Sequence, residues 1–211
     1  MTCTLYILPA EKINLKDPLF LRSMSPERLA KIERYASIAD KKLSMAAELC
    51  ICVAAKENKL PIPPKYKSEE NEKPEFFVSP PYFNVSHCKG YAICAVADSP
   101  VGVDAEPADR VVDERITKRL LRSGEACPSS LWKWVEKESF VKLTGEGLRR
   151  PLSSFTSSPN GIFDPSGKCL ARISRFELRG LLISVAAYVQ ISPTVVRILS
   201  PEHVKAMLAE D

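Results

Sequence analysis

The sequence predicts an α+β fold of two similar lobes, each a small antiparallel sheet packed with helices. Segments with apolar residues at helical spacing are followed by short strand-like segments, and this order occurs twice along the 211 residues. Proline and glycine separate the strand-like segments at short intervals, which favours antiparallel connections. The composition, 45% hydrophobic and 27% charged, is that of an ordinary globular protein. We expect an N-terminal lobe at residues 1–103 and a C-terminal lobe at 104–211, packed as one compact pseudo-dimeric unit.

The first segments predict one strand and two helices. Thr4 to Leu8 is a short apolar run typical of a strand. Ser25 followed by Pro26 is typical of a helix start, because serine caps the free amides and proline suits the first helical position. A wide apolar face predicts a longer helix from about Ala39 to Glu57, and the proline- and charge-rich residues Lys59 to Lys73 indicate a surface connection.

A block of short strands follows, separated by pairs of turn-forming residues. The expected strands are Phe76 to Val78, Tyr82 to Ser86, Tyr91 to Ala97 and Val101 to Glu106. The pairs between them are Pro80-Pro81, Lys89-Gly90 and Ser99-Pro100. Connections this short indicate a meander-like sheet.

The second half returns to helices and then to strands. We expect helices over Arg115 to Arg122 and over Leu131 to Leu143, the second ended by Gly145. The strands expected after them are Ser153 to Phe155, Leu170 to Phe176, Leu181 to Val189 and Val195 to Leu199. A closing helix is expected from Glu202.

Composition and charge argue against several classes of protein. No stretch approaches the roughly 20 apolar residues that span a bilayer, and the N-terminus lacks a signal-peptide pattern, so we expect a cytoplasmic protein with no membrane partner. Seven cysteines, an odd number in apparent core segments, indicate reduced thiols. The net charge of +4 suits an anionic small molecule or an acidic protein, and no dense basic block indicates nucleic acid.

Three acidic residues and a lysine indicate chemistry on a phosphate. Alternate side chains of a strand share a face, so Asp104 and Glu106 should point the same way, opposite to the core. Glu138 follows on a helix, and Lys142 lies four residues later on the same helix face. Mg²⁺ typically takes one or two carboxylates together with phosphates and waters. Singly, these pairs could be a solvated strand end and a surface ion pair, so only their combination indicates a site.

Three stretches, in order, closely resemble the motifs of one enzyme family. They are Phe83-Asn84-Val85-Ser86-His87-Cys88-Lys89-Gly90, Pro100-Val101-Gly102-Val103-Asp104-Ala105-Glu106 and Trp134-x-x-Lys137-Glu138-Ser139-Phe140-x-Lys142. The sequence resembles the 4′-phosphopantetheinyl transferases, and its length resembles their surfactin-type group of single chains with two pseudo-symmetric lobes. The resemblance extends more weakly to residues 25–31 and 151–155.

The resemblance implies a reaction and its catalytic residues. A serine of an apo acyl or peptidyl carrier protein would attack the β-phosphate of coenzyme A, taking phosphopantetheine and releasing 3′,5′-ADP. Asp104, Glu106 and Glu138 would hold Mg²⁺, which Mn²⁺ could replace. The catalytic residues would be Asp104, Glu138 as acceptor of the serine proton, and Lys142 as the cation at the departing phosphate. Such enzymes activate carrier proteins for fatty acid, polyketide and nonribosomal peptide biosynthesis, and we expect a monomer.

The same resemblance implies which residues grip coenzyme A. Ser86, His87 and Lys73 would contact its phosphates together with Lys142. Three further residues match family positions around the nucleotide end, Arg28 and Lys31 near the 3′-phosphate and Ser44 near the adenine.

Two departures and two alternatives remain at this point. Glu72 stands where the family usually has glycine before Lys73-Pro74, and the span between Ser123 and Trp134 is shorter than expected, which bears on carrier specificity. A metal-dependent nuclease or phosphohydrolase could also combine acidic residues with a lysine, although nucleases usually place the later pair on a strand. A catalytically idle homologue could bind coenzyme A without modifying carriers.

Overall fold

The computed structural model describes residues 1–67, 73–191 and 194–209 of the chain. Its helices are α1 (Pro18–Arg22), α2 (Pro26–Glu33), α3 (Ile38–Glu57), α4 (Glu114–Leu120), α5 (Ser130–Thr144), α6 (Pro201–Ala209) and the single 3₁₀ turns η1 (Gly147–Arg149) and η2 (Leu152–Ser154). Its strands in the first half are β1 (Cys3–Pro9), β2 (Tyr66–Lys67), β3 (Glu75–Phe76), β4 (Tyr82–Cys88), β5 (Tyr91–Ala97) and β6 (Val101–Pro107). Those in the second half are β7 (Thr156–Ser158), β8 (Gly161–Phe163), β9 (Cys169–Leu178), β10 (Leu181–Ala187) and β11 (Thr194–Ile198).

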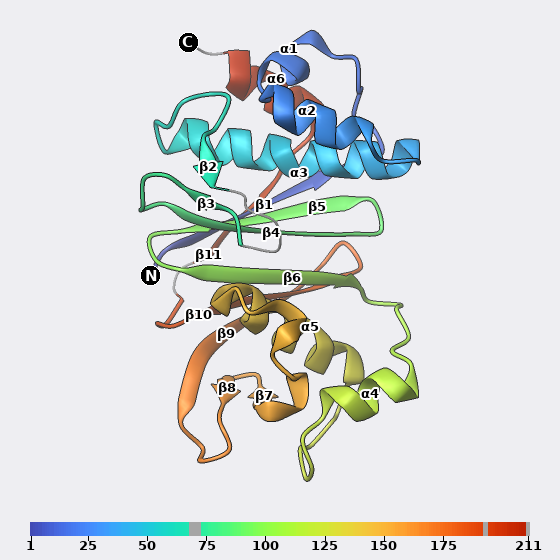
Figure 1. Ribbon diagram of the computed structural model, residues 1–211, viewed down its shortest axis with the longest axis vertical. Helices are drawn as coiled ribbons and strands as arrows, with labels where there is room; N and C mark the ends of the chain where they lie inside the picture. The colour runs from blue at the N-terminus through green and yellow to red at the C-terminus, as the bar shows by residue number, and fades with distance from the viewer. Residues whose placement is uncertain (68–72, 192–193, 210–211) are drawn as a thin grey trace.

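Two sheets form the centre of the molecule, with helices outside each of them (Figure 1). The first sheet has the order β11-β1-β5-β4 and the second the order β6-β10-β9-β8-β7. Helix α3 packs on the first sheet and α5 on the second. The predicted α+β class with antiparallel sheets packed against helices is confirmed.

The alternation of strand side chains divides the core into layers. Tyr6 and Leu8 of β1 face the helices of the first half, whereas Leu5 and Ile7 face the second sheet. There they meet side chains from the second sheet, Val101, Val103, Ala105, Ile183 and Val185. The predicted inward face of the strand at Val101 to Glu106 is therefore correct. Asp104 and Glu106 lie on its other face, toward α5.

The last strand and helix of the chain return to the first sheet. β11 runs parallel to β1, with Val196 opposite Leu5, and Val204 of α6 is fully buried in the core that α3 covers. Strand β6 crosses the expected boundary at residues 103 and 104 and pairs with β10 along its whole length. Strand β1 thus takes the partner on its second edge from the end of the chain, and the division into lobes at 1–103 and 104–211 stays a prediction.

One predicted strand is wrong, and the short elements α1, β2, β7, β8 and η1 were not predicted. Residues 152–154 form the 3₁₀ turn η2 instead of the strand expected at Ser153 to Phe155. The ammonium of Lys137 binds the carbonyls of Leu152 and Phe155, so these groups do not enter a sheet ladder. Helix α1, which Asp17 caps, and the short strand β8 give too little periodicity to be recognised.

Neither a membrane span nor a disulfide is found in the part of the chain described. No helix within it combines the length and apolar character needed to cross a bilayer. All seven cysteines are free thiols, as predicted.

Candidate active site

The two sheets meet along the edge strands β4 and β6, which carry the first two motif stretches, and helix α5 carries the third. β4 and β6 belong to different sheets, so no regular backbone ladder joins them. Instead, the buried side chain of Asn84 accepts a hydrogen bond from the amide of Val103, at 2.8 Å. This bond fixes the register between Ser86 on β4 and Asp104 on β6.

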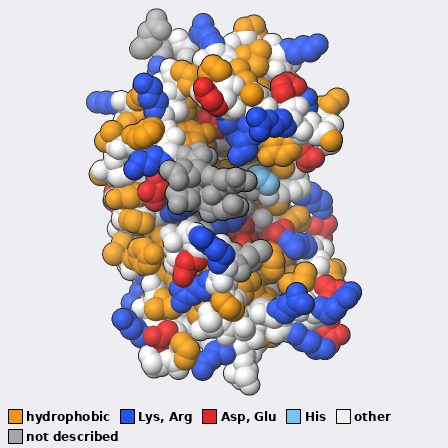
Figure 2. Space-filling model, in the orientation of Figure 1, with side chains coloured by type: hydrophobic (Ala, Val, Ile, Leu, Met, Phe, Trp, Pro, Cys, Tyr) orange, Lys and Arg blue, Asp and Glu red, His pale blue; other side chains and the backbone are white. Residues whose placement is uncertain are grey.

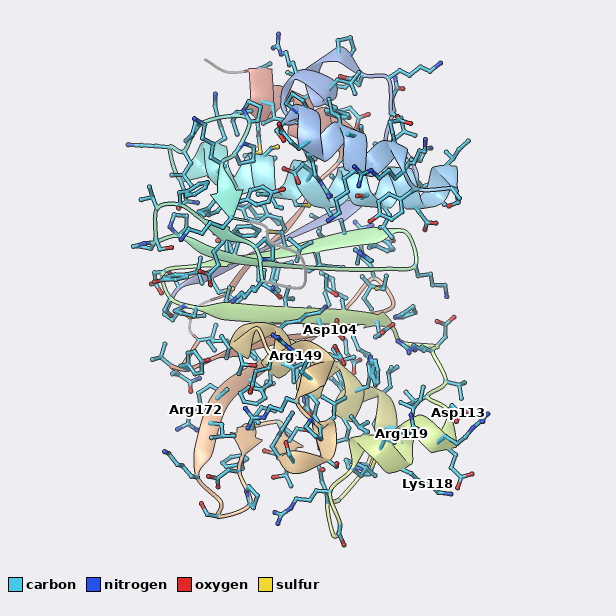
Figure 3. The ribbon with its side chains drawn as sticks, in the orientation of Figure 1. Asp104, Asp113, Lys118, Arg119, Arg149 and Arg172 are labelled. Carbon is cyan, nitrogen blue, oxygen red and sulfur yellow. The ribbon has the colours of Figure 1, made fainter. Side chains whose placement is uncertain are left out.

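Helix α5 packs directly on β6 because residue 102 is glycine. A Cβ atom placed on Gly102 would lie 2.1 Å from the carbonyl oxygen of Ser139 and 2.4 Å from the amide nitrogen of Leu143. Only a residue without a side chain permits so close an approach. The contact brings α5, which carries Glu138 and Lys142, onto the strand that carries Asp104, and Lys142 reaches the Asp104 carboxylate. Figure 3 labels Asp104 between β6 and α5.

Asp104 is held on one oxygen and unpartnered on the other. Its buried carboxylate accepts hydrogen bonds at Oδ1 from Ser86 Oγ, at 2.9 Å, and from Lys142 Nζ, at 2.6 Å. Lys142 also donates to Ser86 Oγ, at 3.0 Å, which closes a triangle of three side chains. Asp104 Oδ2 is buried without any hydrogen-bond partner.

Glu138 offers a second unpartnered carboxylate oxygen. Its Oε1 atom is buried and has no hydrogen-bond partner. Burial raises the pKa of Glu138, the charge of Asp104 raises it further, and Lys142 and Arg110 oppose both effects. A buried oxygen without a partner loses its hydration and gains nothing in return. Two such oxygens close to a lysine suit a divalent cation that binds oxygen ligands.

Glu106, the third predicted ligand, is engaged elsewhere. Its Oε1 atom accepts a hydrogen bond from Trp134 Nε1, at 3.2 Å, and forms an ion pair with Arg110. Across the described ranges 1–67, 73–191 and 194–209, no three Asp, Glu, His or Cys side chains are grouped to hold a metal ion. Asp104 and Glu138 thus keep unpartnered oxygens, whereas one oxygen of Glu106 is engaged, and the three-carboxylate ligand set stays a prediction.

Comparison of the sequence with those of known proteins finds several similar enzymes. No family model matches the chain. It is similar to 4′-phosphopantetheinyl transferase psf-1 of Bacillus pumilus, with 33% identity over 147 residues, 64% of this chain and 63% of that protein. It is also similar to 4′-phosphopantetheinyl transferase gsp of Aneurinibacillus migulanus, with 30% identity over 160 residues, 67% of this chain and 65% of the relative. 4′-Phosphopantetheinyl transferase Sfp of Bacillus subtilis strain 168 matches at 27% identity over 151 residues, 65% of this chain and 67% of Sfp.

The chain is thus similar to curated 4′-phosphopantetheinyl transferases over about two thirds of its length, which supports the superfamily predicted from the motifs. The predicted family and its surfactin-type relatives are thereby confirmed. The matched region spans less than two thirds of the length of psf-1 and of gsp.

Two of the predicted nucleotide-binding residues, Arg28 and Ser44, contact each other. Arg28 donates from Nη2 to the carbonyl oxygen and the hydroxyl of Ser44, at 2.8 and 3.0 Å. Its Nε atom lies 2.8 Å from the buried carboxylate of Glu48, which also accepts from Tyr66. Lys31 and Arg28 line the same pocket. The residues around this pocket are Ser25, Glu27, Arg28, Lys31, Glu48, Pro64, Lys65, Tyr66 and Phe77.

The predicted phosphate contacts are not all on one surface. Ser86 faces Asp104, but His87 is the next residue of β4 and is exposed, so its side chain points to the opposite face of the first sheet. Phe83 and Val85, which share that face with His87, pack against the helices of the first half. Lys73 donates to the carbonyl of Val101, at 2.8 Å, and burial lowers its pKa to about 8. Glu72 lies outside the described residues.

Sequence reasoning missed two residues of the site. Asn84 was part of a recognised stretch, yet nothing in the stretch shows that its amide would bridge two sheets. Arg110 lies beyond Pro107, where the strand pattern has ended, so no periodicity could place its side chain beside Glu106.

Proposed function

We propose that this chain transfers the 4′-phosphopantetheine group of coenzyme A to a serine of an apo acyl or peptidyl carrier protein, releasing 3′,5′-ADP in a Mg²⁺-dependent reaction. One observation carries the proposal. Asp104 and Glu138, both from motif stretches, leave buried unpartnered oxygens beside the ammonium of Lys142. A pair of carboxylates next to a lysine is the arrangement that phosphoryl transfer uses for charge neutralisation.

Asp104 and Glu138 are the residues proposed to hold Mg²⁺. When bound, the ion would neutralise the coenzyme A pyrophosphate as negative charge builds on the leaving side. The hydrogen bonds of Ser86 and Lys142 to Asp104 Oδ1 orient that carboxylate and leave Oδ2 available. The residues present therefore fit a hard divalent cation with at least two protein oxygens.

Glu138 and Lys142 are proposed to handle the proton and the leaving group. The carrier serine oxygen forms a bond to the β-phosphorus, and the bond from that phosphorus to the 3′,5′-ADP oxygen breaks. Glu138 is proposed to take the serine proton as general base. The half-exposed ammonium of Lys142 stabilises the charge on the departing phosphate.

The basic pocket of the first half is proposed to take the nucleotide end of coenzyme A. Its three cations, Arg28, Lys31 and Lys65, outnumber the acidic Glu27 and Glu48, so the lining carries one net positive charge, and Tyr66 and Phe77 give it aromatic surface. On the face drawn in Figure 2, Lys and Arg side chains are dispersed, with Asp and Glu side chains between them. A localised pocket therefore recognises the anionic substrate better than a broad basic surface would.

We also propose that the protein acts as a monomer in the cytoplasm. The residues proposed to hold the metal and handle the proton and the leaving group lie on β6 and α5 of a single chain. The free thiols of all seven cysteines suit a reducing compartment.

Incubation with coenzyme A, Mg²⁺ and a panel of apo carriers, followed by intact mass measurement, tests the proposed transfer. We expect a carrier to gain one phosphopantetheine group. Asp104→Asn and Glu138→Gln should each lower the rate by at least about 100-fold. Glu177→Gln, which removes an exposed carboxylate of β9, serves as the matched control and should keep full activity.

Two outcomes would contradict the proposal. If no carrier gains mass while coenzyme A still binds, the protein is an idle coenzyme A-binding homologue. If Mg²⁺-dependent cleavage of plasmid DNA is found instead, the carboxylates serve a nuclease.

A further inference from the structure

Helix α5 carries two buried lysines on the face opposite Lys142. Lys133 and Lys137 lie about one turn apart on the same face of the helix. Lys142 lies about two and a half turns beyond Lys133, so its side chain leaves the helix on the opposite face. The ammonium groups of Lys133 and Lys137 both bind the carboxylate of Glu125, at 3.0 and 2.7 Å. These two lysines are therefore separate from the proposed catalytic site.

The buried charges of this cluster do not balance. The side chains of Lys133, Lys137 and Glu125 are 7%, 0% and 2% exposed, so two buried ammonium groups share one carboxylate. The neighbouring pair does not supply the missing charge, because Arg175 and the fully buried Glu136 neutralise each other. One positive charge therefore remains. A buried charge without a counter-charge destabilises the folded protein.

The surplus charge lies beside a cavity of about 410 Å³, whose lining includes Glu125, Lys133, Ser157 and Arg175. Lys133 uses two of its three N–H bonds, on Glu125 Oε1 and on the carbonyl of Ser157. Arg175 donates to Glu136 from Nε and Nη2, and its Nη1 atom makes no hydrogen bond within residues 1–67, 73–191 and 194–209. Both cations of the lining thus keep donors for a ligand.

Ser157 adds a buried hydroxyl group without a partner. The residue is 4% exposed, and its Oγ atom has no hydrogen-bond partner in the described part of the chain. Ser157 lies opposite Ile162 in the ladder between β7 and β8, and Ile162 packs in the core with Phe140 of α5. Because opposite residues of an antiparallel pair share a face, the hydroxyl points to the α5 side, where Lys133 lies. A ligand that pairs with this hydroxyl would recover the free energy that its burial costs.

We propose that this cavity is a binding site for a phosphate group, held by Lys133, Arg175 and Ser157. The charge of a phosphate offsets the surplus positive charge of the cluster. Its oxygens point in several directions, so it can accept from an ammonium, a guanidinium and a hydroxyl at the same time. The site is distinct from the proposed transferase site and does not depend on it.

Tryptophan fluorescence reports on this cavity, because Arg175 lies over the ring of Trp132, 4.9 Å from its centroid. Titration with inorganic phosphate, at an ionic strength kept constant with KCl, should change the emission of the wild type until the site is saturated. Both tryptophans of the chain lie on α5, so phosphate bound in the pocket of Arg28 and Lys31 should not change the emission. Trp132→Phe should remove the signal.

Two variants test the proposed ligands of the phosphate. Lys133→Met should weaken phosphate binding by at least about tenfold, because the surplus charge and a charged donor are lost. Ser157→Ala should weaken it by about two- to tenfold without destabilising the free protein, since the hydroxyl has no partner to lose. This second variant decides the question if Lys133→Met does not fold. Lys168→Met, which removes an exposed lysine between β8 and β9, is the control and should keep the wild-type affinity.

Three outcomes would overturn the proposal. The first is a wild type in which phosphate changes neither the emission nor the midpoint of thermal unfolding. The second is equal phosphate affinity in Lys133→Met and the wild type, because phosphate would then bind elsewhere. The third is equal affinity in Ser157→Ala and the wild type, because the hydroxyl would then make no contact. If the results are as expected, a titration with glycerol 3-phosphate shows whether the site prefers a free phosphate ion or a phosphate ester.

Discussion

At the scale of single residues, the buried carboxylate of Glu125 joins α5 to the segments packed against it. Both oxygens of Glu125 are fully used: Oε2 accepts from Lys137 and from the amide of Arg122, and Oε1 accepts from Lys133 and from the amide of Ser157. Lys137 is completely buried and also donates to three carbonyls, those of Leu120, Leu152 and Phe155. A charge is tolerated there because every donor has an acceptor.

Glu125→Gln should destabilise the protein at neutral pH, and the difference from the wild type should shrink in acid. Burial alone would raise the pKa of Glu125, but its bonds to Lys137, Ser157, Arg122 and Lys133 outweigh burial and hold the pKa below that of an ordinary glutamate. Its stabilisation is therefore present above the unfolded pKa and is lost as the pH falls through the folded pKa. The expected loss at neutral pH is about 3–5 kcal/mol, since the variant leaves Lys137 buried without its counter-ion.

Urea unfolding of Glu125→Gln and of the wild type, from neutral pH down to about pH 3, measures this difference. Glu177→Gln is the control for the removal of a carboxylate and should follow the wild type throughout. A difference that stays constant across the pH range would show that Glu125 is not ionised in the folded protein.

At the scale of elements, the site depends on how closely α5 lies on β6. Gly102→Ala places a methyl group where the carbonyl of Ser139 and the amide of Leu143 now lie, so the helix must move. Overpacking of this kind costs about 1–3 kcal/mol. A helix shift of about 1 Å at Glu138 and Lys142 would lower the transfer rate by about 100-fold, more than the loss of stability explains.

Thermal unfolding and transfer rate, measured on the same samples, separate the two effects of Gly102→Ala. Gly167→Ala is a suitable control, because Gly167 has a positive φ of 87° but nothing within 4 Å of a built Cβ. It should lose about 1 kcal/mol from backbone strain and keep its activity. Equal activity in the two variants would show that the spacing between α5 and β6 is not critical.

The elements themselves were largely predictable from the sequence, whereas their long-range contacts were not. Ser129 caps α5 and Gly145 ends it in the left-handed conformation, which are local signals. The alternation along β6 correctly separated Asp104 from the core. The prediction of a strand at Ser153 to Phe155 was wrong because the carbonyls of Leu152 and Phe155 accept hydrogen bonds from Lys137 of α5. Likewise, no local sequence pattern specifies the turn that brings Arg110 into an ion pair with Glu106.

At the scale of the whole molecule, the two sheets share one core and one seam. Asn84 is 5% exposed and supplies the acceptor for the amide of Val103 across the seam. Asn84→Ala should cost about 1–3 kcal/mol, because this buried amide loses its partner. The variant should also weaken Mn²⁺ binding, since Ser86 would no longer be held against Asp104. Asn160→Ala, in an exposed turn, should change neither property, and intact Mn²⁺ binding in Asn84→Ala would show that the seam does not position Asp104.

The shared core predicts that both halves unfold together, and Val204→Ala tests this directly. Val204 of α6 is fully buried in the core beneath α3, whereas both tryptophans, Trp132 and Trp134, lie on α5 in the other half. Removing two methyl groups from Val204 should cost about 1–3 kcal/mol. If the sheets form one cooperative unit through residues such as Leu5 and Val185, tryptophan fluorescence and far-ultraviolet circular dichroism should report the same lowered midpoint. If the dichroism midpoint falls while the tryptophan midpoint stays at its wild-type value, the halves unfold independently and the shared core does not couple them.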